Sequence, residues 1–222
     1  MDHAELKGLA SISYPKDVYT ALDSETQEFR LLVLEQAQEK DDPVHCSVRK
    51  VSLLSTPPPL YETVSYVWGD TELKSEIFIH GRTTLVGYSA VQVLRRFRER
   101  GRDRVLWIDA VCINQHNDEE RSRQVAMMAD IYSGCTGVLI WLGEDNGFAE
   151  RASLVIDAVV ENAKLHIDDL HQLANVWEPG LPVSAGAIDK TIDLEPFYQL
   201  CSSPWFTRLW EYLRRADKPL CQ

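Results

Sequence analysis

The chain has 222 residues, of which 45% are hydrophobic and 26% charged. It is therefore long and apolar enough for one large or two small domains with a packed core, and too apolar for a disordered chain. Its formal net charge of -11 at pH 7 argues against a nucleic-acid partner, because binding to the phosphate backbone depends on an excess of lysine and arginine.

The cysteines and the first residues indicate a reducing environment. The five cysteines are an odd number and include no CxxC pair, so neither a disulfide framework nor a zinc knuckle is predicted. Residues 1–5 are polar and acidic, and no window approaches about 18 uninterrupted apolar residues, which predicts neither a signal peptide nor a membrane-spanning helix. We expect a cytoplasmic protein that does not associate with a membrane.

The first predicted elements form an N-terminal β-hairpin. After an irregular segment over residues 1–25, residues 29–34 and 44–51 have the composition of two strands, the second alternating apolar and polar positions. Residues 39–43 between them contain two aspartates and a proline, which are typical of a turn. Three prolines at 57–59 predict a short extended spacer inside the domain rather than a domain boundary.

A second set of elements follows the spacer. Residues 63–68 predict a buried strand that breaks at Gly69-Asp70, so that an aromatic side chain, a flexible glycine and a carboxylate lie at its end. Residues 77–86 predict a small hairpin that turns at Gly81. Residues 89–100 predict a helix with apolar positions spaced along one face.

The stretch 105–115 is the most informative part of the chain. Its apolar run ends on Asp109 and gives way to Asn114-Gln115, a pattern typical of a buried parallel strand that delivers polar groups to its carboxyl end. Ligands bind at that edge in open α/β sheets. Asn117 and Glu120 then have the spacing of a capping box, which predicts that a helix begins there.

The next elements complete a strand, helix, strand unit. A helix is predicted over residues 118–132, and the buried strand 138–142 follows it and ends at Gly143-Glu144-Asp145. This spacing is typical of a βαβ unit, so we predict an α/β fold with a mostly parallel sheet flanked by helices. The ends of the buried strands are expected to share one cleft.

The carboxyl-terminal third is predicted to be largely helical. Helices are expected over residues 149–162 and 168–176, separated by a proline- and glycine-rich loop at 179–186 from a last helix. That helix should begin after Ser203-Pro204, because serine is a natural cap and proline a natural first helical residue. Residues 26–222 are expected to form a single domain.

Three polar residues at the end of the stretch 105–115 are candidate site residues. Asp109 could orient a ligand hydroxyl or act as a catalytic base, or it could cap the backbone amides of the following loop. Asn114 and Gln115 carry donors and acceptors that suit ribose or amide recognition. Bracing a tight loop explains the same two residues with fewer assumptions.

The other candidates flank these residues in the sequence. Trp68 could stack on a base or on nicotinamide beside Gly69 and Asp70, although aromatic residues that end a buried strand usually belong to the core. Glu120 is a candidate catalytic carboxylate, but its role as a capping partner is favoured. Arg121 could bind a ligand, or it could bridge to Asp109 or Asp70.

No metal and no resident cofactor are predicted. Cys112 and His116 could form a nucleophile and base, but a small buried residue at position 112 is favoured because no oxyanion hole or third member is evident. The six histidines show no HExxH motif and no metal-ligand spacing with the cysteines.

Several blocks of residues, spread in order between positions 61 and 210, together carry a family resemblance. They are Tyr66-Val67-Trp68-Gly69-Asp70; Leu106-Trp107-Ile108-Asp109-Ala110-Val111-Cys112-Ile113-Asn114-Gln115; Glu120-Arg121 with Gln124-Val125 and Met128; Ile131-Tyr132; residues 138–143; and Pro204-Trp205-Phe206 with Arg208 and Trp210. With these blocks the chain resembles the fungal heterokaryon incompatibility (HET) domain. The set is highly specific, whereas any one block alone would be weak.

The resemblance implies a TIR-like, flavodoxin-like fold and a role in fungal allorecognition and programmed cell death when genetically different cells fuse. It implies a signalling or interaction module whose partners are other proteins or further copies of itself. The alternative is a TIR-like NAD glycohydrolase, for which NAD is a nucleotide substrate and not a cofactor. Such an enzyme needs a carboxylate beside the ribose, because the departing nicotinamide leaves an oxocarbenium-like centre.

The last motif departs from the family pattern. The family usually continues into a Gln-Glu pair, with the Glu four residues after the Trp that matches Trp210; here that position is Arg214. This substitution counts against the NAD glycohydrolase alternative, in which Asp109 or Glu120 would have to replace the missing carboxylate. Residues 211–222 are either a truncated or misread terminus or the end of a protein that has lost activity.

Overall fold

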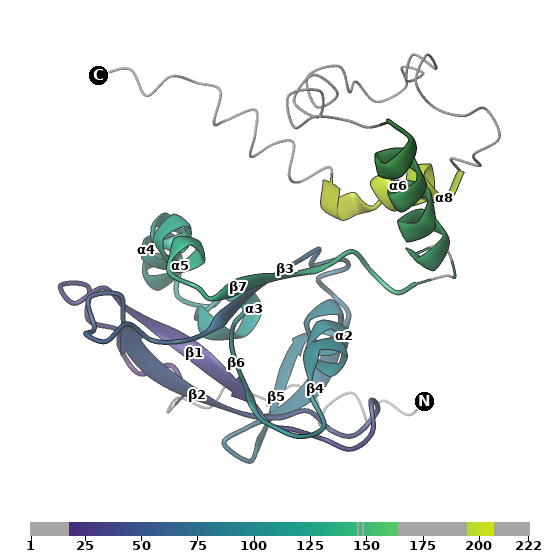
Figure 1. The fold of residues 1–222 in the computed structure, drawn as a ribbon. Helices are drawn as coiled ribbons and strands as arrows, with labels where there is room; N and C mark the ends of the chain where they lie inside the picture. The colour runs from purple at the N-terminus through teal and green to yellow at the C-terminus, as the bar shows by residue number, and fades with distance from the viewer. Residues whose placement is uncertain (1–17, 146, 148, 164–194, 207–222) are drawn as a thin grey trace, which may run out of the picture. The chain divides into compact units, whose positions relative to one another are not determined.

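The computed structural model describes residues 18–145, 147, 149–163 and 195–206 (Figure 1). The chain divides into two compact units, Met1–Trp141 and Leu142–Gln222. Among the described residues, none of the helices combines the length and the apolar character needed to cross a membrane.

The first unit is built on a seven-stranded sheet in the order β5-β4-β2-β1-β6-β3-β7. Its strands are β1 (Glu28–Leu34), β2 (His45–Ser52), β3 (Glu62–Tyr66), β4 (Lys74–Ile79), β5 (Arg82–Gly87), β6 (Arg104–Trp107) and β7 (Gly137–Trp141). Its helices are α2 (Tyr88–Phe97), α3 (Asp109–Cys112), α4 (Asp118–Ala126) and α5 (Met128–Ser133). The α/β class is as predicted.

The expected mostly parallel sheet is wrong, because the sheet is mixed. β3 runs parallel to β6 and β7, and β2 runs parallel to β4, but the pairs β1–β2, β1–β6 and β4–β5 are antiparallel. The two strands of the N-terminal hairpin, β1 and β2, are not added to one edge of the sheet. They lie in the middle of the mixed seven-stranded sheet. Short hairpin connections allow only antiparallel neighbours, whereas parallel strands need a long crossover.

Both predicted hairpins are confirmed as pairs of neighbouring antiparallel strands, β1–β2 and β4–β5. The second turns at His80-Gly81, whose φ angles are 52° and 75°. A two-residue hairpin loop with positive φ at both positions follows the right-handed twist of the flanking strands. Glycine reaches this region without steric cost, which is why Gly81 marked the turn in the sequence.

The predicted strand, helix, strand unit is present between β6 and β7, but its helical part is divided. β6 ends at Trp107, and residues 109–112 form the single helical turn α3. The predicted helix 118–132 is two helices, α4 and α5, separated at Met127, whose φ and ψ are -87° and -5°. The Met127 amide is shared between the carbonyls of Arg123 and Gln124, and no proline or glycine marks this break in the sequence.

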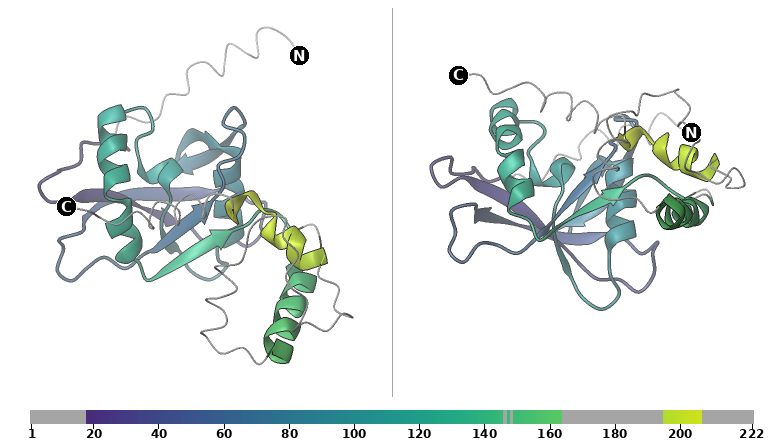
Figure 2. Two further views of the ribbon diagram at one scale, coloured as in Figure 1. Left: turned by 90° about the horizontal axis from the view of Figure 1, so that it is seen from above. Right: turned by 45° about the horizontal axis from the view of Figure 1, so that its top comes forward.

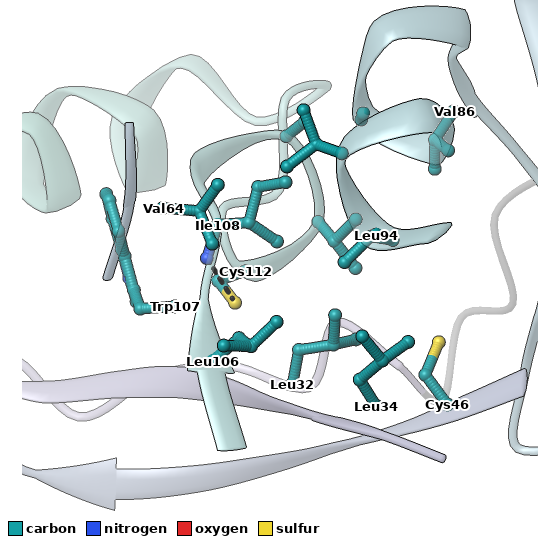
Figure 3. Packing of buried hydrophobic residues seen from close by; sticks show 14 of the residues in the cluster. Leu32, Leu34, Cys46, Val64, Val86, Leu94, Leu106, Trp107, Ile108 and Cys112 are labelled. Carbon is teal, nitrogen blue, oxygen red and sulfur yellow. Dashed lines mark hydrogen bonds between the residues drawn. The ribbon is translucent and has the colours of Figure 1, made fainter. Parts of the chain in front are cut away.

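The core of the first unit lies around β1 and β6. In Figure 3, Leu32, Leu34 and Leu106 from the sheet point towards Leu94 of α2, and all four side chains are buried. Trp107, fully buried, instead packs edge to face against Tyr132 of α5, with ring centroids 5.6 Å apart. Successive residues of a strand point to opposite faces, so β6 supplies side chains to both sides of the sheet.

The second unit contains α6 (Ala149–Ala163) and α8 (Glu195–Cys201), which lie side by side (Figure 2). The predicted helix 149–162 is confirmed by α6. Residues 204–206 are helical, and the Ser203 hydroxyl accepts from the Trp205 amide at 3.4 Å, so the predicted start of a helix at Ser203-Pro204 is also confirmed. The predicted helix 168–176 and the loop 179–186 lie outside the described residues.

Candidate functional site

The carboxyl ends of β3 and β6 bring Trp68 and Asp109 together. These two strands are parallel neighbours, so their carboxyl ends lie at the same edge of the sheet. The indole Nε1 of Trp68 donates to Oδ2 of Asp109 at 2.9 Å, and both residues are half-buried. Two residues that the sequence assigned to separate strand ends therefore form one cluster.

Asp109 holds the start of α3 as well as Trp68. Its second carboxylate oxygen, Oδ1, accepts from the amide of Ala110 at 2.7 Å. Its main-chain carbonyl accepts from the Gln115 side chain at 2.8 Å and from the Ile113 amide at 3.2 Å. The Asp109 carboxylate therefore bonds one backbone amide of the turn that follows it, although the N-cap residue of α3 is Ile108. A role of Asp109 in binding a ligand or in catalysis stays a prediction.

Gly69 and Asp70 shape the turn that follows β3. Gly69 has φ +67°, and a Cβ added there would lie 2.8 Å from the hydroxyl of Ser89. Positive φ and this close approach both favour glycine. Asp70 is exposed and its carboxylate accepts from the Glu72 amide at 2.9 Å, a local turn contact that leaves its proposed ligand role as a prediction.

The loop after α3 is braced by its own side chains. Asn114 Oδ1 accepts from the His116 amide at 3.2 Å, and Gln115 reaches back to α3 as described. Arg121 donates to the carbonyl of Gln115 at 3.1 Å and pairs with Asp118 at 2.9 Å. The expected bracing of the loop by Asn114 and Gln115 is thus observed. Arg121 pairs with Asp118 of its own helix and not with Asp109 or Asp70, so the bridge expected for it is wrong. The ligand-binding roles of these residues stay predictions.

Glu120 lies in a buried ion pair with Arg30 of β1. Arg30 is fully buried and Glu120 is 5% exposed, and the guanidinium donates to both carboxylate oxygens, at 2.5 and 3.1 Å. Arg30 is not among the residues predicted from the sequence. The signal that could have revealed it is a single charged residue inside the apolar strand 29–34, because a buried charge needs a partner.

Cys112 is a buried residue of α3, as favoured from the sequence. Its side chain is inaccessible to solvent. The Ile108 amide donates a hydrogen bond to the Cys112 sulfur at 3.5 Å, drawn as a dashed line in Figure 3. Burial raises the pKa of the Cys112 thiol to about 12. Thiolate is the nucleophilic form of cysteine, so the buried thiol gives no support to a nucleophile and base pair with His116.

We expect iodoacetamide at neutral pH to leave Cys46 and Cys112 unmodified in the folded protein and to modify both in urea. Burial raises the pKa of both thiols to about 12, well above the ordinary value of a thiol. At a pH between about 9 and 12 the thiols of the folded protein therefore stay protonated, whereas those of the unfolded chain ionise.

The free energy of unfolding should consequently fall as the pH rises from about 9 towards 12. Peptide mass spectrometry checks the labelling, with the half-buried Cys201 as reference; labelling of folded Cys112 as fast as Cys201 would contradict it.

The other predicted features belong to the second unit or lie outside the described residues. Gly143-Glu144-Asp145 follow β7 but belong to the second unit, so the shared cleft stays a prediction. Trp210 and Arg214 lie outside the described residues. Within the described part of the chain, no group of three or more His, Cys, Asp or Glu residues is arranged to hold a metal ion.

Comparison with known proteins gives one family and one informative relative. The family model described as "Heterokaryon incompatibility protein (HET)" matches residues 61–213. The chain is 34% identical over 163 residues to "Heterokaryon incompatibility protein 6, OR allele" of Neurospora crassa. The match covers 68% of this chain but 23% of that protein, so the chain spans about a quarter of the relative's length. No solved structure matches.

Proposed function

Because this chain belongs to the heterokaryon incompatibility (HET) family, we propose that it acts in fungal heterokaryon incompatibility. In this role it is a signalling and interaction module that initiates cell death when genetically different cells fuse. The observation that carries the proposal is the family match over residues 61–213, which includes every candidate site residue. The similarity to a relative named for heterokaryon incompatibility agrees with it.

The contacts of the site carboxylates support a module rather than an enzyme. Both oxygens of Asp109 accept hydrogen bonds from the protein, one from Trp68 and one from Ala110. Both oxygens of Glu120 accept from Arg30. Carboxylates held in this way position the surrounding backbone, which is the role expected in an interaction module; a general base must in addition face the reacting group.

Expression of this chain in a fungal host from an inducible promoter tests the proposal. We expect growth arrest and loss of viability on induction, measured by dye exclusion at matched protein levels. Trp68→Ala should weaken the response because it removes the indole that bonds Asp109. Leu54→Ala, at a side chain that is 62% exposed, is the control and should behave as the parent; viability equal to that of the empty vector would reject the proposal.

The proposed partners are proteins in the cytoplasm, either sensor proteins or further copies of this chain. A net charge of -11 favours sensor proteins with basic surfaces over further copies of the acidic chain, because electrostatic complementarity speeds association. Size-exclusion chromatography with light scattering over a concentration series, with and without a candidate sensor domain, would detect them. A mass that stays at one monomer in every mixture would count against this part of the proposal.

The TIR-like, flavodoxin-like fold and the NAD glycohydrolase activity form the alternative. The parallel run β6-β3-β7 is compatible with such a fold, but the antiparallel β1 and β2 at the centre have no place in a purely parallel sheet. The comparisons lend no support to the enzyme. Nicotinamide release from NAD by the pure protein, lost in Asp109→Ala, would favour the enzyme over the module.

A further inference from the structure

The ion pair between Arg30 and Glu120 connects β1 to the start of α4. It is bidentate, with two parallel hydrogen bonds, which is the strongest arrangement of an arginine and a carboxylate. Burial of both charges costs least when the geometry is good and further hydrogen bonds are made. Both terminal nitrogens of Arg30 make such bonds, whereas its buried Nε has no hydrogen-bond partner. The other contacts of these two side chains therefore show what the pair holds in place.

Those contacts lead to the backbone of the candidate site. Arg30 Nη1 also donates to the carbonyl of Cys112 at 3.3 Å. Glu120 Oε1 also accepts from the amide of Asn114 at 2.8 Å. The pair thus bonds the main chain on both sides of Ile113, between the α3 turn that begins at Asp109 and the loop that carries Asn114.

Residues 18–21, which we call the N-terminal strap, complete this arrangement. The Tyr19 ring lies over the Arg30 guanidinium, 4.9 Å from its central carbon, and the Tyr19 hydroxyl donates to the carbonyl of Val111 at 2.9 Å. The carbonyl of Thr20 accepts from Arg30 Nη2 at 2.7 Å. Val18 is buried in the core. The strap therefore contacts both the ion pair and α3 itself.

We infer that Tyr19 and Arg30 are positioning residues of the candidate site. They act through Glu120 and through the backbone of α3, which together place Asp109 against Trp68. Both residues precede position 61, so they lie outside the region that the family model matches. The inference concerns the site of the proposed function and rests on it for its biological meaning, but the geometry is independent of the biological role.

A local positioning role differs measurably from a general contribution to the core. If the strap and the ion pair hold the site, their loss should loosen residues 109–117 and leave the β4–β5 hairpin, residues 74–87, unchanged. A general core role would instead loosen both regions together. Amide hydrogen exchange measured peptide by peptide on the full chain separates the two, because it reports local opening.

The first variant is Tyr19→Ala, with Tyr198→Ala of the second unit as the matched control. Tyr19→Ala removes the hydroxyl bond to Val111 and the ring over Arg30. We expect exchange in residues 109–117 to rise about fivefold or more, the factor that corresponds to the loss of one hydrogen bond. Tyr19→Phe keeps the ring and should give a smaller rise, whereas Tyr198→Ala should give none there.

The second variant is the double change Arg30→Met with Glu120→Leu. Apolar side chains of similar volume often replace a buried ion pair without loss of stability, so this variant should fold. The Asn114 amide then loses its acceptor, and exchange in residues 109–117 should still rise while residues 74–87 keep their protection. This variant removes the risk that a single change simply fails to fold.

Two results would overturn the inference. One is unchanged exchange in residues 109–117 in both Tyr19→Ala and the double variant. The other is an equal rise in residues 74–87, which would assign these residues to the core alone. Exchange is measured on the purified chain and does not depend on cell death, so a failed viability assay would reject the proposed function and leave this result standing.

Discussion

Replacing Glu120 with glutamine is expected to lower the free energy of unfolding by about 3–5 kcal/mol, the cost of leaving one charge of a buried pair without its partner. Arg30 is fully buried, and the neutral amide of glutamine cannot accept both of its hydrogen bonds as a carboxylate does. Urea denaturation with linear extrapolation measures the change.

Glu119→Gln is the matched control for this prediction. Glu119 is the preceding residue of the same helix, it pairs with Arg123 at 2.9 Å, and 79% of its side chain is exposed. Exposed pairs of this kind contribute at most about 1 kcal/mol. If Glu120→Gln proved as mild as Glu119→Gln, the buried pair would not stabilise the fold in the way described.

The change Trp107→Ala is expected to cost about 3–5 kcal/mol, the range for truncating a buried aromatic residue. Trp107 is fully buried, and its indole packs against the Tyr132 ring of α5. The change would leave a cavity between β6 and α5 that the surrounding backbone cannot fill. The midpoint and slope of a urea unfolding curve give the value.

Two comparisons make the Trp107 result specific. Trp107→Phe keeps an aromatic ring next to Tyr132 and should lower the free energy of unfolding less than Trp107→Ala. Leu54→Ala, at an exposed position, should stay within about 0.5 kcal/mol of the parent, as surface changes usually do. An equal loss for Trp107→Phe and Trp107→Ala would show that the ring packing against Tyr132 contributes little.

Local elements were predictable where one or two residues determine them. Gly81 marked the second hairpin because its turn needs positive φ. Asn117 marked the start of α4, where its side chain accepts from the Glu120 amide at 3.0 Å. The second half of that capping box did not form as expected: the Glu120 carboxylate pairs with Arg30, a residue 90 positions away, and no local pattern reveals such a partner.

The arrangement of the strands was not predictable in the same way. The alternation of apolar and polar residues shows that a strand has a buried face, but it carries no information about which strands become neighbours. The antiparallel contact of β1 with β6 therefore could not be foreseen. Together with the two antiparallel hairpins, this contact makes the sheet mixed rather than mostly parallel.

The candidate site was predicted in part. Trp68 and Asp109 were both assigned to strand ends, and the parallel pairing of β3 with β6 brings them into contact. Their hydrogen bond could not be predicted, because it depends on the register of two strands whose pairing was unknown. Arg30 and the strap lie far from the site in sequence and were missed for the same reason.

The central position of β1 and β2 limits what can be removed from this chain. A fragment that contains only the family-matched residues 61–213 would keep β4–β5 and β6-β3-β7 but lose the two strands between them. β4 and β6 would then each expose a row of unpaired backbone donors and acceptors, which readily pair with other chains. Such a fragment should aggregate on expression, so the smallest useful recombinant piece must retain the segment from the strap onward.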